Sequence, residues 1–91
     1  MPESGCSRYA VSILPAALRV IERSHKRKTL RAKIDGLQEN PRPQQAIHLQ
    51  GRPNNEWRLR VGDYRVTFVI DDAACTVLVK TVETRGHAYR N

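Results

Sequence analysis

The sequence predicts an α+β fold, with two helices packed on one face of a small antiparallel sheet. Hydrophobic and polar residues alternate near the N-terminus and again in the C-terminal half, which is the periodicity of half-buried strands. Between these regions, hydrophobic residues recur at helical spacing in two consecutive stretches. The predicted order is therefore one strand, a helical hairpin and a three-stranded antiparallel meander.

The N-terminal region combines a polar end with the first predicted strand. Residues 1–7 are mostly small and polar, so we expect them to be disordered and residues 8–91 to form a single domain. Tyr9, Val11 and Ile13 occupy alternate positions and predict a strand.

Two helices are predicted next. Pro15 suits the first turn of a helix, where its missing N–H would have no partner, and this helix is expected over about 15–24. A second amphipathic helix is expected over about 27–38. Its apolar positions follow the spacing i, i+4, i+7 and are Leu30, Ile34 and Leu37. The Asn-Pro-Arg-Pro sequence at 40–43 should end it, since a residue before proline is displaced from helical geometry.

The segment 56–65, which reads E-W-R-L-R-V-G-D-Y-R, predicts a β-hairpin. Its strands are expected at about 56–61 and 64–70. Gly62 and Asp63 form the turn between them, and glycine at the first central position suits a type II′ turn, which needs a positive φ there.

The segments on either side of the hairpin complete the prediction. The polar stretch before residue 55 contains several turn-forming residues and is assigned no strand. After the hairpin, a turn at 71–74 leads to an aliphatic, β-branched segment at 75–82, which predicts a buried strand. Residues 83–91 are expected to form a short polar tail.

The charge of the chain points to a polyanionic partner. Its 91 residues carry 16 Lys and Arg against 9 Asp and Glu, giving a net charge of +7. Such an excess is typical of proteins that bind nucleic acid or an acidic protein. A membrane partner is not expected, because no segment has the length or amphipathicity for one. With no secretion signal either, the sequence predicts a cytoplasmic protein.

The two cysteines are not expected to pair. Cys6 lies in the segment predicted to be disordered and Cys75 in a predicted strand, so both are interpreted as free thiols. Neither a metal nor another cofactor is expected, because the chain has no C-x-x-C or H-x-x-x-H spacing.

Three arginines suggest the function. Arg58, Arg60 and Arg65 lie on neighbouring predicted strands beside one tight turn, so their side chains are expected to converge on one surface. Guanidinium groups gathered in this way repel one another unless an anion lies among them. The hypothesis is that this anion is the phosphate of RNA.

Four segments together resemble the RelE/ParE superfamily of bacterial toxins, and most of all its RelE branch of mRNA interferases. They are L-x-x-N-P-R-P at 37–43, L-x-G at 49–51, W-R-L-R-V-G-D-Y-R at 57–65 and R-x-x-x-Y at 85–89. The resemblance implies a curved antiparallel sheet with a helical hairpin on its convex side. It also implies an endoribonuclease that cleaves translated mRNA in the A site of the 70S ribosome and is neutralised by an acidic, partly disordered antitoxin.

The same resemblance implies the site residues. The family's active site corresponds here to Arg58, Arg60, Arg65, Arg85 and Tyr89. Some relatives have lysine at the first two of these positions, whereas arginine stays protonated and is a poor proton shuttle. The sequence continues for two residues after Tyr89, so the C-terminal helix of some relatives is not expected here.

Metal-free RNA cleavage requires attack of the ribose 2′-OH on the adjacent phosphorus, stabilisation of the phosphoryl charge and protonation of the 5′-oxygen. Arg65 and Arg85 suit charge stabilisation, while Arg58 and Arg60 would orient the RNA backbone. Tyr89 would stack on a base, take part in proton transfer, or simply cap the core.

Other basic residues are candidates for RNA binding. The run Arg23, Lys26, Arg27, Lys28, Arg31 and Lys33 is either a solvated helix face or a surface that binds ribosomal RNA. His87 is either a general acid or a solvated residue of the tail.

Two other functions remain open. A ParE-like protein of the same fold would inhibit DNA gyrase without cleaving RNA, and a plain RNA-binding module would perform no chemistry. The ParE-like toxins generally lack the full set of basic residues and tyrosine found here.

Overall fold

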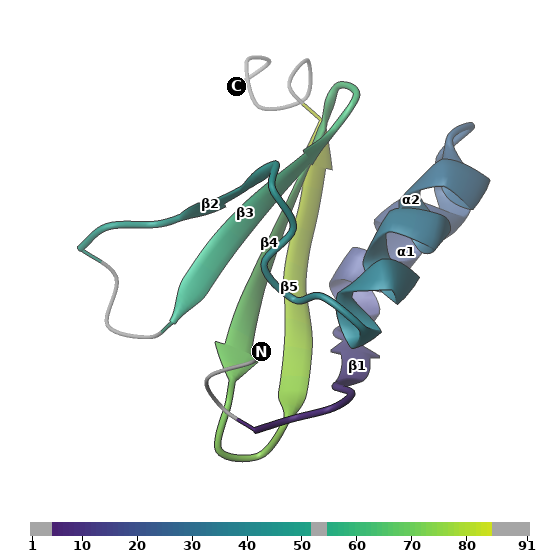
Figure 1. Ribbon diagram of the computed structural model, residues 1–91. Helices are drawn as coiled ribbons and strands as arrows, with labels where there is room; N and C mark the ends of the chain where they lie inside the picture. The colour runs from purple at the N-terminus through teal and green to yellow at the C-terminus, as the bar shows by residue number, and fades with distance from the viewer. Residues whose placement is uncertain (1–4, 52–54, 85–91) are drawn as a thin grey trace.

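The computed structural model describes residues 5–51 and 55–84 of the chain. Five strands form one sheet in the order β1-β5-β4-β3-β2, and two helices and a short 3-10 helix lie between the first two strands in the sequence (Figure 1). The strands are β1 (Ala10–Ile13), β2 (Ala46–His48), β3 (Glu56–Val61), β4 (Tyr64–Asp71) and β5 (Thr76–Thr84), and the helices are α1 (Pro15–Arg23), α2 (Arg27–Asp35) and η1 (Gly36–Gln38).

The predicted α+β class and element order are confirmed, with two differences in the sheet. Strands β3, β4 and β5 form the antiparallel meander, but β1 pairs with β5 in parallel, so the sheet is mixed. Strand β2, which was not predicted, pairs antiparallel with β3. It has only three residues in a polar stretch, too few for its periodicity to be recognised.

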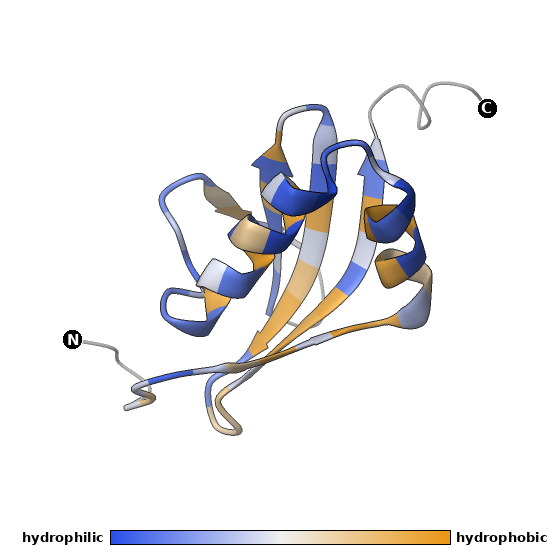
Figure 2. Cartoon of the chain, turned by 90° about the vertical axis from the view of Figure 1, so that its right-hand side faces the viewer, coloured by the Kyte–Doolittle hydropathy of each residue, from blue (hydrophilic) through white to orange (hydrophobic). Residues whose placement is uncertain are grey.

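The core lies between the sheet and the helices. Alternate residues of β4 are buried, including Val66 and Phe68, and they belong to the same core cluster as Ile21 and Leu30 from the two helices. Figure 2 shows the helices lying across one face of the sheet, with hydrophobic residues along the strands that they cover. The other face of the sheet has no covering element among the described residues.

The hairpin between β3 and β4 has the predicted turn. Val61 pairs with Tyr64 across Gly62 and Asp63. Gly62 has a φ of 60°, and Cys75 is the only described residue other than glycine with a positive φ. Positive φ at the first central residue alone is the pattern of a type II′ turn, whose twist matches that of the two strands.

The interpretation of the cysteines as free thiols is wrong. Cys6 and Cys75 form a disulfide, and their Cα atoms are 5.8 Å apart. The parallel pairing of β1 with β5 brings the segments before the two strands together, and the Ala10 N–H donates to the Cys75 carbonyl at 2.9 Å. Cys6 is also buried, so the predicted disordered segment does not extend to residue 6, whereas residues 1–4 lie outside the described part.

Candidate functional site: the open face of the sheet

The register of β3 and β4 brings three of the predicted site residues to one face. Arg60 is directly opposite Arg65, and Arg58 is opposite Thr67. Successive residues of a strand point to opposite faces, and the intervening Leu59 and Val66 are buried on the side of the helices. Arg58, Arg60 and Arg65 therefore share the open face, as the sequence predicted.

In the described part of the chain, no carboxylate forms an ion pair with any of these three arginines. Within residues 5–51 and 55–84, the Nε atom of Arg65 is also buried without a hydrogen-bond partner. Like charges directly opposite each other destabilise a sheet, by roughly 0.2–1 kcal/mol for such a pair. The arrangement is therefore a cation cluster suited to an anionic ligand, although it costs the free protein stability.

A partly buried ion pair lies farther along the same face. Lys80 donates to the Oε2 atom of Glu56 at 2.9 Å, and the side chain of Glu56 is only 5% exposed. Lys80 is the extra residue of a β-bulge, because Thr67 pairs with Thr81 and Phe68 pairs with Val79. β-Bulges redirect side chains, and here the bulge lets Lys80 cross β4 to reach β3.

The predicted basic run does not form one continuous surface. At one end, the Nζ atom of Lys26 lies 2.6 Å from where a Cβ on Gly62 would be, so Lys26 packs on the hairpin turn. Arg23 lines a cavity of about 230 Å³ between the end of α1 and the ends of β4 and β5. These two residues therefore lie at the hairpin end of the molecule, near Arg60 and Arg65.

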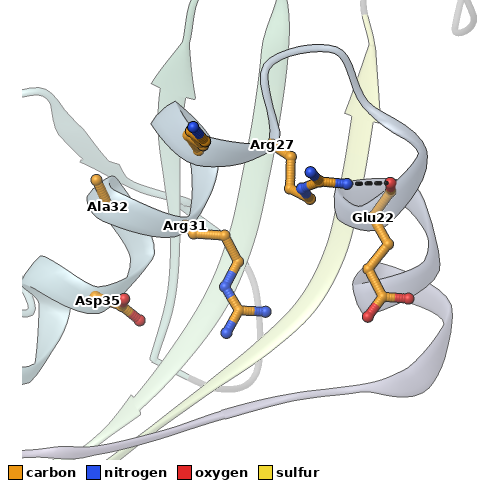
Figure 3. Close-up of a pocket in the computed structure, with 6 residues that line it drawn as sticks. Glu22, Arg27, Arg31, Ala32 and Asp35 are labelled. Carbon is orange, nitrogen blue, oxygen red and sulfur yellow. Dashed lines mark hydrogen bonds between the residues drawn. The ribbon is translucent and has the colours of Figure 1, made fainter.

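The rest of the run faces a different direction. Arg27, Lys28 and Arg31 line an open groove of about 660 Å³ together with Glu22 and Asp35 (Figure 3). This groove is lined by residues of the two helices only, on their outer side in Figure 3. Lys33 is exposed on α2 and does not line the groove.

The Asn-Pro-Arg-Pro motif has a structural role that the sequence did not reveal. Arg42 forms an ion pair of 2.7 Å with Asp72 in the turn between β4 and β5, and its guanidinium lies 5.5 Å from the centre of the Trp57 ring. The Tyr9 hydroxyl also donates to Asp72 at 2.6 Å. The hydrogen bonds from Arg42 and Tyr9 lower the pKa of Asp72, and the one to Asp72 raises the pKa of Arg42. The motif thus fastens the loop after α2 to the sheet.

The remaining predicted site residues, Arg85, His87 and Tyr89, lie outside the described part of the chain. In the part that is described, no group of His, Cys, Asp and Glu side chains could hold a metal ion. None of the helices there is long and apolar enough to cross a membrane.

Solved structures of toxin–antitoxin systems share this fold. The RelE–RelB complex from Pyrococcus horikoshii gives a TM-score of 0.77 at 24% identity, covering 87% of this chain and 97% of the matched one. The RelBE2 complex from Mycobacterium tuberculosis gives 0.71 at 25% identity, covering 86% and 92%. The intact RelBE complex from E. coli gives 0.65 at 26% identity, covering 84% and 95%. No curated protein sequence matches the chain.

A family model, described as the ParE toxin of the type II toxin–antitoxin system parDE, matches residues 11–89. That match spans both helices, the arginines of the hairpin and the C-terminal tail. The chain therefore belongs to the ParE toxin family of type II toxin–antitoxin systems, within the RelE/ParE superfamily.

Proposed function

We propose that this toxin is a ribosome-dependent endoribonuclease, which cleaves mRNA in the A site by attack of the ribose 2′-OH on the adjacent phosphorus. The observation that supports this most is that Arg58, Arg60 and Arg65 share the open face and that none of them forms an ion pair within residues 5–51 and 55–84. Three guanidiniums on one face of a hairpin suit the binding of a scissile phosphate, whereas inhibition of gyrase does not require them.

Each residue has a distinct role in this proposal. Arg65, with Arg85 from the tail, stabilises the negative charge that develops on the phosphoryl oxygens. Arg58 and Arg60 hold the RNA backbone in register, and Tyr89 stacks on a base. Lys26 and Arg23 extend the positive surface past the hairpin turn and bind neighbouring phosphates. His87 contributes to RNA binding.

Ribosomal RNA is proposed to contact the basic side chains of α2. These are Arg27, Lys28 and Arg31 in the groove, and Lys33 outside it. The 70S ribosome would then bind at the helices while mRNA lies on the sheet, and the toxin would act in the cytoplasm.

A cognate antitoxin is also proposed as a partner, since structural neighbours are complexes of RelE with RelB. A net charge of +7 favours an acidic antitoxin.

The test is brief induction of the toxin followed by mapping of transcript 5′ ends. We expect cuts within translated codons for the wild-type chain and their loss for Arg65→Gln, because the transition state then lacks a fixed charge. Removing such a donor typically lowers the rate by about 10²–10³-fold. Arg19→Gln is the matched control, since Arg19 is an exposed arginine of α1 outside the site, and it should cleave normally.

Inhibition of DNA gyrase is the second candidate function, and the match to the ParE family model favours it. In that case, induction would stop replication while transcripts stay intact, and Arg65→Gln would not change the RNA. Purified toxin would also inhibit supercoiling by gyrase directly.

A further inference from the structure

Glu83 is a carboxylate in the same row as the arginine cluster. It is directly opposite Arg65 on β5, and Arg65 is directly opposite Arg60 on β3. Three neighbouring strands therefore carry Arg60, Arg65 and Glu83 side by side on the open face. Adjacent strands are about 4.8 Å apart. When Arg65 binds a phosphate, the ribose attached to that phosphate can therefore lie next to Glu83.

The β-bulge determines this position. Val77 and Val79 are buried on the helix side, and without the bulge Glu83 would share their face. Because Lys80 is inserted, Val82 becomes the buried residue and pairs with Val66, which turns Glu83 to the open face. Bulges next to active sites commonly re-aim a side chain in this way.

The arginine cluster lacks a group that can accept a proton. Guanidinium groups remain protonated, so Arg58, Arg60 and Arg65 can stabilise charge but cannot take the proton of a 2′-OH. A carboxylate can do so, provided that it lies within hydrogen-bond reach of the hydroxyl.

Other carboxylates on this face are less suitable. Glu56 is buried and held by Lys80, and Asp71 lies at the opposite end of β4, where its Oδ1 accepts a hydrogen bond from the Ala74 N–H. Glu83 is exposed and forms no ion pair or side-chain hydrogen bond within the described ranges. It is therefore free to meet a substrate.

We infer that Glu83 is the general base of the cleavage reaction, an inference that rests on the proposed ribonuclease function. Its carboxylate removes the proton from the ribose 2′-OH, and the 2′-oxygen forms a bond to phosphorus. The bond between phosphorus and the 5′-oxygen then breaks, and that oxygen takes a proton from water. The products are a 2′,3′-cyclic phosphate and a 5′-OH end, and the proton on Glu83 returns to solvent.

The charged groups around Glu83 suit this role. Arg65 faces it from β4, with Arg60 beyond on β3, and Arg23 from α1 lines the same cavity as Glu83. Arg60 and Arg65 hold the substrate phosphate beside the carboxylate, and they also stabilise the alkoxide as it forms.

The experiment measures single-turnover cleavage of mRNA in the A site of programmed ribosomes, with the full-length toxin, over a range of pH. Glu83→Gln should lower the rate by about 10²–10⁴-fold, the usual contribution of a general base. It should also remove the rise in rate with pH on the acidic side, and Glu83→Asp should retain part of the activity. Ribosome affinity, measured with mRNA bearing a 2′-deoxy nucleotide at the cleavage site, should be unchanged.

Asp63→Asn is the matched control, because Asp63 is an exposed carboxylate in the neighbouring turn; it should cleave like the wild type. If Glu83→Gln cleaves at the wild-type rate, or loses affinity and rate together with an unchanged pH profile, Glu83 is not the base. If the wild-type chain itself cleaves no mRNA, the proposed ribonuclease function fails, and the inference about Glu83 fails with it.

Discussion

At the scale of single residues, a few polar contacts join parts of the chain that are far apart in sequence. Asp72 accepts hydrogen bonds from Arg42 and from Tyr9, which lie 30 and 63 residues away. The first contact fixes the loop after α2 and the second fixes the start of β1, so both depend on one carboxylate. Asp72 must be ionised to accept both bonds fully.

This dependence gives a prediction for the effect of pH on stability. Because the pKa of Asp72 is lowered in the folded protein, its contribution is present above the unfolded-state pKa of about 3.9. The contribution is lost as the pH falls through the lower, folded-state value. Asp72→Asn should therefore reduce the free energy of unfolding at neutral pH, and the difference from wild type should shrink below about pH 4.

Urea unfolding monitored by Trp57 fluorescence at several pH values measures this difference. Asp63→Asn serves as the control, since Asp63 is exposed and forms no ion pair in the described part of the chain. If Asp72→Asn stayed less stable than the wild type by the same free energy of unfolding below about pH 4, the contribution of Asp72 would not be electrostatic.

At the scale of elements, the hairpin of β3 and β4 organises the site. Its two-residue turn fixes the register, and the register places Arg60 opposite Arg65. A different turn would shift one strand against the other by a residue and move the arginines to opposite faces. Gly62, with its positive φ in this turn, therefore helps to place the arginines on one face.

Replacing Gly62 by alanine should therefore weaken the hairpin. Its φ of 60° is unfavourable for a residue with a Cβ, by about 1–2 kcal/mol. The new Cβ would also displace the flexible end of Lys26. Chemical denaturation should show a loss of that size in the free energy of unfolding.

Gly36→Ala is the matched control, because Gly36 has a φ of −64° and open space around its Cβ position. This variant should be neutral or stabilising by up to about 1 kcal/mol. Equal losses in both variants would contradict a cost due to backbone conformation.

Periodicity predicted the elements better than it predicted their partners. The strands β3 and β4, with six and eight residues of clear alternation, were predicted within one residue, as was the start of each helix. The parallel pairing of β1 with β5 depends on tertiary packing, which no local pattern encodes. Likewise, Glu83 was assigned to a polar tail, because the bulge at Lys80 interrupts the alternation from which its face could have been read.

At the scale of the whole molecule, one disulfide joins the segment before β1 to the residue that precedes β5. Cys6 and Cys75 are 69 residues apart, and their disulfide encloses β1, both helices and most of the sheet. A domain of 91 residues has only a modest core. A cross-link that closes so long a loop is therefore expected to contribute a large part of its stability.

Reduction of this disulfide should lower the free energy of unfolding by about 2–4 kcal/mol, because the unfolded chain regains the freedom that the cross-link removes. The measurement is chemical denaturation with and without a reducing agent. The double variant Cys6→Ser with Cys75→Ser should resemble the reduced wild type and should not respond to the reducing agent. An identical unfolding curve for the wild type in both conditions would show that the disulfide adds no stability. Disulfides seldom persist in a reducing cytoplasm, so the free energy of unfolding that remains after reduction measures the stability that the helix–sheet core supplies when both thiols are free.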